Sequence, residues 1–427
     1  MTGGNSPEKN KTQRRGIAAW CFYDWANSAF PTVITTFVFA AYFTKAIAAD
    51  EITGTAQWGY AISLSGLAVA VVAPLLGAVA DFGGRRKPWI FAFTVICAVA
   101  TALLWQAKPD VSFVFLALVL TAVANFAFEM AMVFYNAMLP DLASKDRIGR
   151  VSGWGWGLGY GGGLACLGLA LVALVEAETP VFGLDKGQAE HLRATGPMVA
   201  MWIMVFAVPL FVWTPDRPSR GLRIGDAFRK GSSSLIDTLR RIREHKDIVR
   251  YLIARMIYTD GLNTLFAFGG IYAAGSFGMD FSELILFGIA INVTAGLGAA
   301  GFAWIDDRIG PKRTIQIAVI GLTVLGGALV VVEGKTLFWA LALPLGIFVG
   351  PAQAASRSLM AHLAPAEIRT KMFGLYALSG KATAFIGPAL LAWVTVASGS
   401  QRAGMATILV FFVVGLGLLS GVPDRRR

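Results

Sequence analysis

Twelve apolar runs, separated by short polar segments, constrain this chain more than any other feature. Each run is close to the roughly 20 apolar residues that a helix needs to cross a bilayer. Strands of a β-barrel would alternate polar and apolar residues, and these runs do not, so an all-α polytopic membrane protein is predicted. The predicted spans are 17–46, 57–80, 88–107, 111–139, 151–175, 196–214, 252–275, 284–305, 314–332, 337–361, 372–398 and 404–422.

The basic residues indicate how these spans are oriented. If the N-terminus is cytoplasmic, 28 of the 37 Lys and Arg fall in cytoplasmic segments and far fewer in external ones. Lys and Arg bias short loops toward the cytoplasm, so both termini are expected there. The net charge of +11 then reflects membrane orientation, and no nucleic-acid partner is predicted. Short loops without targeting extensions predict a bacterial inner membrane.

Composition excludes several other classes. Only 15% of the residues are charged, against about 25% in soluble domains. The three cysteines are scattered through the spans and the three histidines lie in different loops, so neither a disulfide framework nor a metal site is predicted. A phosphate-binding loop is absent from the sequence, as are clustered metal ligands and a nucleophile–base pair. We therefore expect no enzyme activity and no cofactor.

The widest cytoplasmic segment separates six spans from six. Its apolar residues, such as Leu235 and Leu239, recur at helical spacing, which predicts an amphipathic helix on the inner membrane surface. A plain charged linker is the alternative. The predicted domains are a cytoplasmic tail (1–16), a six-helix bundle (17–214), the linker (215–250), a second six-helix bundle (251–422) and a basic tail (423–427).

The two halves share internal signals. Asp24 and Asn27 of the first span are echoed by Asp260 and Asn263 of the seventh, both within D-x-x-N-[S/T]. Residues three apart share a helix face, so each span is expected to present a carboxylate beside an amide. A second echo keeps a constant offset of 221: it aligns Leu142, Ala143, Asp146, Arg150, Gly153 and Gly159 with Leu363, Ala364, Glu367, Lys371, Gly374 and Gly380.

A third echo follows the second and eighth spans, where an Asp is followed three residues later by Gly and then by a basic cluster. Two parallel six-span repeats are typical of transporters that bind substrate near the midplane. The first copy, Gly77–Lys87, resembles the major facilitator superfamily signature G-x-L-A-D-x-x-G-R-[K/R], with Val79 in place of Leu. The resemblance implies gating roles for Gly77, Asp81, Gly84, Arg85, Arg86, Asp307, Gly310, Lys312 and Arg313.

Three further motifs narrow the resemblance. The segments Tyr23–Phe30, Phe134–Ala137 and Ser356–Ala361 resemble the vacuole-effluxer-like branch of that superfamily. This branch includes the autophagy-related vacuolar amino-acid exporters of fungi and bacterial members. The resemblance implies export of amino acids or another small polar solute. Export of lipophilic drugs or lipids is the alternative, and the polar stripes described next argue against it; a membrane-embedded enzyme is a more remote one.

Six ionisable residues are predicted within the spans, where a charge costs at least about 2.5–3.5 kcal/mol. Three acids and three bases also allow a structural alternative, in which buried ion pairs hold helices together. The predicted substrate-binding or coupling residues are Asp24, Asn27, Asn125, Glu129, Asn136, Asp260, Asn263, Gln353, Arg357 and Lys381. The sixth ionisable residue, Arg255, lies near the inner interface and is expected to be structural.

Specific roles follow from charge and spacing. Glu129 lies on a polar stripe of span 4 and is the predicted proton-coupling residue, with a fixed ion pair as the alternative. Arg357 or Lys381 is expected to hold a substrate carboxylate, and Asp24 or Asp260 the ammonium group. Glycines of span 5, from Gly153 to Gly163, predict close helix packing or a hinge. The expected partners are a small-molecule substrate, protons and membrane lipids, and a monomer is expected.

Overall fold

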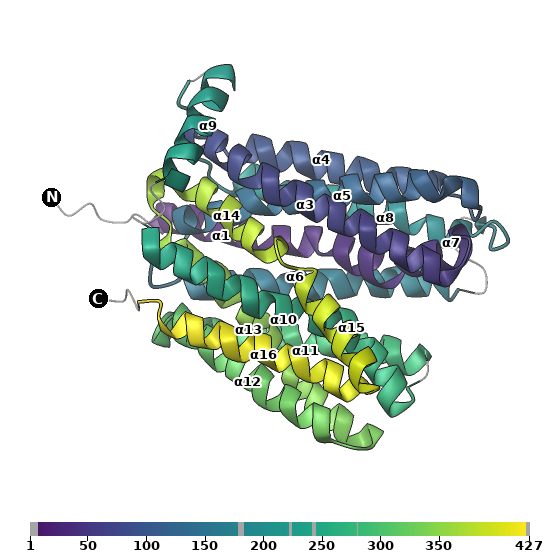
Figure 1. The fold of residues 1–427 in the computed structure, drawn as a ribbon. Helices are drawn as coiled ribbons and strands as arrows, with labels where there is room; N and C mark the ends of the chain where they lie inside the picture. The colour runs from purple at the N-terminus through teal and green to yellow at the C-terminus, as the bar shows by residue number, and fades with distance from the viewer. Residues whose placement is uncertain (1–6, 178–182, 222–223, 241–244, 280, 424–427) are drawn as a thin grey trace. The chain divides into compact units, whose positions relative to one another are not determined.

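The computed structural model describes residues 7–177, 183–221, 224–240, 245–279 and 281–423, and within these ranges all regular structure is helical. Residues 1–6 and 424–427 of the predicted tails, and 222–223 and 241–244 of the linker, lie outside the described residues. The helices (Figure 1) are α1 (Pro7–Asn27), α2 (Phe39–Tyr42), α3 (Glu51–Gly83), α4 (Lys87–Leu103), α5 (Val114–Leu142), α6 (Ile148–Ala170), α7 (Glu190–Arg193), α8 (Thr195–Trp213), α9 (Ile224–Arg240), α10 (Lys246–Phe277), α11 (Phe281–Ile309), α12 (Pro311–Val331), α13 (Lys335–Leu363), α14 (Arg369–Lys381), α15 (Ile386–Ser398) and α16 (Gln401–Ser420).

Eleven helical segments among the described residues are long and apolar enough to cross a membrane. The all-α membrane fold is therefore confirmed. The predicted span 252–275 is not among the eleven, although it lies within α10, which has 32 residues. This helix includes Arg255 and Asp260, and its polar residues make it less apolar than the other spans. Residues 252–275 thus form a helix, but they are not apolar enough to count among the eleven candidate membrane spans.

Two predicted spans are interrupted. In the first, α1 ends at Asn27 and a π-helical segment, Phe30–Phe37, follows with Pro31 near its start. In the eleventh, α14 ends at Lys381 and α15 begins at Ile386, so residues 382–385 form a non-helical break. Each interruption adjoins a residue that the sequence analysis placed in the site, and interrupted helices expose backbone groups that can meet ligands.

The chain forms two compact units. The first comprises residues 1–72, 84–138 and 158–220, and the second comprises 73–83, 139–157 and 221–427. In the first unit α1 and α4 pack on α8. In the second, α10 packs on α16, and α13 packs on both α11 and α12 (Figure 1). The ends of α3 and α5 and the start of α6 therefore belong to the second unit, and the domain boundaries proposed from the sequence remain a prediction.

Helix α9 occupies the linker and packs on the end of α3. A Cβ added at Gly231 would lie 2.8 Å from the backbone nitrogen of Val79, so the two helices touch at backbone distance. Lys371 Nζ donates to the Ser234 hydroxyl at 3.0 Å. Phe228 and Ile236 remain exposed on α9. The helix is thus held by its small residues, and its contact with a membrane surface stays a prediction.

Within the first unit, the glycines of α6 pack against α1. A Cβ at Gly162 would lie 2.2 Å from the carbonyl oxygen of Trp25, and one at Gly163 would lie 2.4 Å from Thr32 Oγ1. A contact below 3 Å with a backbone atom forces the helices apart. The glycine row of span 5 therefore allows the two backbones to approach closely, as small residues do in membrane bundles.

We predict that Gly162→Ala destabilises the protein and that Gly168→Ala, on the same helix with nothing within 4 Å of its Cβ position, does not. The expected cost at Gly162 is roughly 1–3 kcal/mol, typical of overpacking. The thermal unfolding midpoints of the two variants in detergent measure the difference. Equal midpoints would show that α6 and α1 tolerate separation at this point.

Candidate functional site

Asp24 lies buried between α1 and α5, with 5% of its surface exposed. Its Oδ2 accepts a hydrogen bond of 2.8 Å from the hydroxyl of Tyr135, which also lies 3.0 Å from the Trp20 carbonyl oxygen. The Trp20 indole stacks on the Tyr135 ring with centroids 4.3 Å apart and donates to the Tyr135 carbonyl. The aromatic pair thus fixes the Asp24 carboxylate to α5.

The polar stripe predicted on span 4 lies on α5. Asn125 donates to Ser65 Oγ of α3 at 2.6 Å, and Asn27 Nδ2 lies 3.0 Å from the sulfur of Met132. Glu129 and Asn136 are half-buried on the same helix. Asn27 and Asn125 are therefore engaged with α5 and α3, respectively, and the coupling role of Glu129 stays a prediction.

Asp260 is buried within the second unit, with 2% of its surface exposed. Its Oδ2 accepts a hydrogen bond of 3.2 Å from the backbone N–H of Gly387, in the first turn of α15. Asn263 is exposed, whereas its counterpart Asn27 is buried. The two D-x-x-N motifs therefore differ in their surroundings, although their sequences correspond.

The basic residues of the second unit are engaged differently from one another. The fully buried Arg357 donates from Nε to Ser152 Oγ at 2.9 Å and from Nη2 to the Ser152 carbonyl. Arg255 stacks on the Tyr376 ring and donates from Nη1 to Ser379 Oγ. The Nε–Nη2 edge of Arg357, a residue expected to hold a substrate carboxylate, thus faces Ser152. Gln353 and Lys381 are half-buried, and the roles of all three predicted residues stay predictions.

Asp81 caps a helix that is distant in the sequence. Its Oδ1 accepts the backbone N–H of Thr370 at 3.0 Å and its Oδ2 accepts that of Lys371 at 2.9 Å. Both amides belong to the first turn of α14, where backbone N–H groups lack helical partners and carry partial positive charge. Gly77 permits the approach, because a Cβ there would lie 2.7 Å from the Thr370 carbonyl oxygen. The carboxylate therefore ties the end of α3 to the start of α14.

Asp307 makes the corresponding contact at the start of α6. Its carboxylate accepts the backbone N–H groups of Gly149 and Arg150, the latter at 3.0 Å, and lies 3.1 Å from Arg150 Nε. Gly149 and Arg150 precede Thr370 and Lys371 by the offset of 221 that the sequence repeat shows. The same cap thus occurs twice, once at the first turn of each repeat's fifth span.

The remaining predicted gating residues occupy varied positions. Arg86 is buried, and its backbone N–H, like that of Lys87, donates to the Asp216 carboxylate, which thereby caps α4. Lys312 Nζ donates to the Ser420 carbonyl at 2.9 Å. Gly84 and Gly310 have φ angles of +87° and +97°, which favour glycine. Arg85 and Arg313 are exposed.

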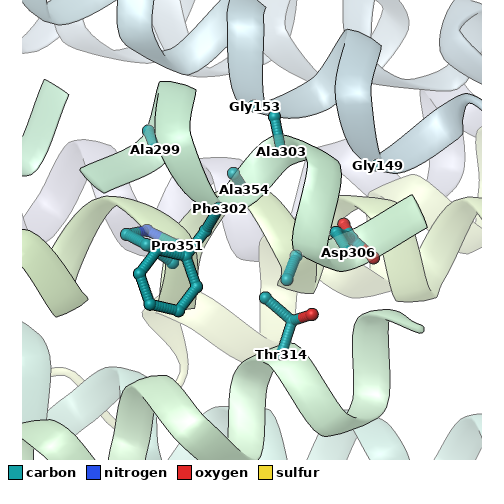
Figure 2. Close-up of a pocket in the computed structure, with 10 residues that line it drawn as sticks. Gly149, Gly153, Ala299, Phe302, Ala303, Asp306, Thr314, Pro351 and Ala354 are labelled. Carbon is teal, nitrogen blue, oxygen red and sulfur yellow. The ribbon is translucent and has the colours of Figure 1, made fainter. Parts of the chain in front are cut away.

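A small cavity adjoins the Asp307 cap (Figure 2). The buried Asp306 lines it, and Gly149 lies beside the Asp306 carboxylate, because a Cβ there would be 2.5 Å from Asp306 Cγ. Thr314 and Pro351 also line the cavity. Only glycine at position 149 lets α6 begin this close to two neighbouring carboxylates.

Several residues of the site were not identified from the sequence. Tyr135, Ser152 and Asp216 form hydrogen bonds that hold predicted residues, yet they lie far from their partners in the chain. Tyr135 lies within one of the family-like segments, which was the only signal. Within the described residues, no group of three or more His, Cys, Asp or Glu side chains is arranged to hold a metal ion.

The comparisons with known proteins agree with this architecture. Residues 44–427 match the family described as "Vacuole effluxer Atg22 like". The uncharacterised major-facilitator-type transporter YxiO of Bacillus subtilis is 29% identical over 95% of this chain and 94% of its own length. Autophagy-related protein 22 of Coccidioides immitis is 24% identical over 86% of this chain and 72% of its own length.

Solved structures show the same fold. The human organic anion transporter MFSD10 superimposes with a TM-score of 0.72 at 15% identity, covering 95% of this chain and 99% of the other. The proton:xylose symporter XylE superimposes with a TM-score of 0.70 at 15% identity, covering 97% and 96%. At these identities the likeness establishes the major facilitator fold. The family and structural relatives are transporters and not enzymes.

We predict that the two caps open independently. Asp81→Ala should speed amide hydrogen exchange at Thr370 and Lys371, and Asp307→Ala at Gly149 and Arg150, each by roughly threefold to thirtyfold, because a lost cap costs about 0.5–2 kcal/mol. Exchange measured by mass spectrometry on the two peptides tests this, with each variant serving as the control for the other. Unchanged exchange at the capped peptide would show that the carboxylate does not hold the helix start.

Proposed function

The chain belongs to the Atg22-like vacuole effluxer family of major facilitator transporters, and on that premise we propose that it exports amino acids by proton-driven alternating access. The observation that carries the proposal is the pair of buried carboxylates, Asp24 and Asp260, at equivalent positions of two repeated bundles. Buried acids in membrane spans mark substrate and proton pathways. An amino acid carries both an ammonium and a carboxylate, and the second unit also contains buried cationic groups.

The duplicated caps support the alternating-access part of the proposal. Asp81 and Asp307 each hold the first turn of a span through backbone hydrogen bonds. A transporter needs such contacts at its gate, because they form in one state and open in the other. In this proposal the caps belong to the cytoplasmic gate, and both chain termini lie on that side.

The outward direction and the location follow from the relatives. The family description names a vacuole effluxer, which supports outward transport, and the Bacillus subtilis relative supports a bacterial inner membrane for this chain. We propose a monomer with protons and surrounding lipids as its partners. Proton coupling is supported by the intramembrane carboxyl groups, since a buried acid can take up and release a proton near neutral pH.

The first experiment measures uptake of a panel of radiolabelled amino acids into proteoliposomes with and without an imposed pH gradient. We expect gradient-dependent accumulation of one chemical class, because protonation of a buried carboxyl is coupled to substrate movement. Liposomes without protein and liposomes with an added protonophore are the controls. No transport of any amino acid by folded protein would remove the proposed substrate while leaving the family intact.

A second prediction concerns the gate. Asp81→Asn should lower the turnover rate severalfold and leave the apparent affinity nearly unchanged, because Asp81 contacts helix α14 and is assigned no substrate contact. Asp226→Asn is the matched control, since this half-buried aspartate of α9 forms a 3.8 Å ion pair with Arg229 that contributes little in water. Initial rates as a function of substrate concentration separate the two parameters. A large loss of affinity would place Asp81 in the binding site.

A further inference from the structure

The break in the eleventh span is joined to the seventh span by one carboxylate. Residues 382–385 leave the helix after Lys381, and α15 begins again at Ile386 (Figure 1). Asp260 of α10 accepts the Gly387 N–H at 3.2 Å, so it acts as the N-terminal cap of α15 from a neighbouring helix. This cap differs from those of Asp81 and Asp307, because it lies well inside the predicted span.

The second oxygen of this carboxylate has no hydrogen-bond partner among the residues that the structure describes. Asp260 Oδ1 is buried, and the whole residue is only 2% exposed. A buried acceptor without a partner is costly, and such groups in native structures call for an explanation. This oxygen can be satisfied by a water molecule, by a bound ligand or by a proton on the carboxyl itself.

The space beside Oδ1 is kept open by a glycine. A Cβ at Gly387 would lie 3.2 Å from Asp260 Oδ1 and 2.1 Å from Thr264 Oγ1, so both oxygens border the position that a side chain would fill. Thr264 Oγ1 donates its own proton to the Asp260 carbonyl at 2.8 Å, which leaves its lone pairs available. Asp260 Oδ1 and Thr264 Oγ1 thus border the same point beside Gly387, with no hydrogen bond between them in this structure.

This carboxyl has no counter-ion among the residues that the structure describes. Helices α11, α13, α14, α15 and α16 pack against α10, and α15 carries no ionisable residue. Among the described residues, Asp260 forms no salt bridge, and the Gly387 N–H is the hydrogen-bond donor to its side chain. The basic groups on the helices around it have other partners or lie at helix ends. Arg255 donates to Ser379, Arg357 to Ser152 and Arg402 to the Val330 carbonyl. Lys381, which is half-buried, ends α14.

We propose that Asp260, Thr264 and Gly387 form a proton-binding site whose occupancy controls the attachment of α15 to α10. This assignment rests on the proposed function, and it names Asp260 rather than Glu129 as the carboxyl that carries the coupled proton. A metal cation fits less well, because two oxygens beside a helix N-terminus give few ligands and an opposing partial charge.

The chemistry of the site is a single proton transfer. The ionised carboxylate accepts the Gly387 N–H and is favoured by the positive end of α15. When a proton binds Oδ1, the carboxylic acid donates to Thr264 Oγ1 and its attraction to the helix end weakens. Protonation thus loosens α15, the second half of the broken span, from α10. The break at 382–385 lets α15 move without displacing α14.

Infrared difference spectroscopy tests the site without any substrate. The purified full-length protein in lipid is titrated from alkaline to acidic pH, and the C=O stretch of a protonated carboxyl in an apolar environment is followed. We expect this band in the wild type and in Glu129→Gln, and its loss in Asp260→Asn, whose amide still accepts the Gly387 N–H. Persistence of the whole band in Asp260→Asn, or its loss in Glu129→Gln, would overturn the assignment.

Thr264→Val provides the second variant, because it keeps the shape of the side chain and removes only the hydroxyl. Removing the acceptor of the protonated form should move the midpoint of the band to more acidic pH. An unchanged midpoint would exclude Thr264 from the site. If the band disappears in Asp260→Asn and the wild type transports no amino acid, the proton site is upheld and the proposed substrate is rejected. If Asp260→Asn still shows gradient-driven transport at the wild-type rate, the proton site alone is rejected.

Discussion

A carboxylate at the first turn of a helix is the interaction on which the rest of this structure depends. Helix starts leave backbone N–H groups without partners, and a buried start needs an acceptor from elsewhere. Here aspartates supply it from distant segments: Asp81 to α14, Asp307 to α6, Asp216 to α4 and Asp260 to α15. Because the helix end is partly positive, each contact has an electrostatic component of roughly 0.3–1 kcal/mol and up to about 2 kcal/mol where it is partly buried. Energies of this size are large enough to order the start of a helix and small enough for it to open.

The caps require glycines, and the sequence repeat supplies both together. At Gly374 a Cβ would lie 2.5 Å from the Ala73 carbonyl oxygen, and at Gly153, which precedes it by 221 residues, a Cβ would lie 2.6 Å from that of Ala299. In both repeats the start of the fifth span therefore contacts another helix at backbone distance, one turn after the capped amides. The constant offset of 221 therefore corresponds to one geometry that occurs in both repeats: an aspartate caps the first turn of the helix, and a glycine one turn later contacts a neighbouring backbone.

Much of the fold was predictable, because membrane spans are encoded locally by apolar length and the repeat is visible in the sequence. The positions of the caps were not, since D-x-x-G patterns identify a loop but not the amides that it reaches. The side-chain partners were also hidden: nothing near Arg357 in the chain indicates that Ser152 occupies its guanidinium edge. The break after Lys381 was missed for a related reason, because residues 382–385 are as apolar as a helix would require and only the Asp260 contact distinguishes them.

The two repeats differ at their buried aspartates. Asp24 and Asp260 share one motif, yet the first receives a tyrosine hydroxyl and the second retains a buried oxygen without a hydrogen-bond partner among the described residues. The Tyr135 hydroxyl donates to one oxygen of Asp24 and the Gly387 N–H to one oxygen of Asp260, and the second oxygen of Asp260 remains for the proposed proton. An alternating-access transporter that moves one proton needs one such carboxyl. In our proposal, the asymmetry between the repeats therefore places the exchangeable proton in the second bundle.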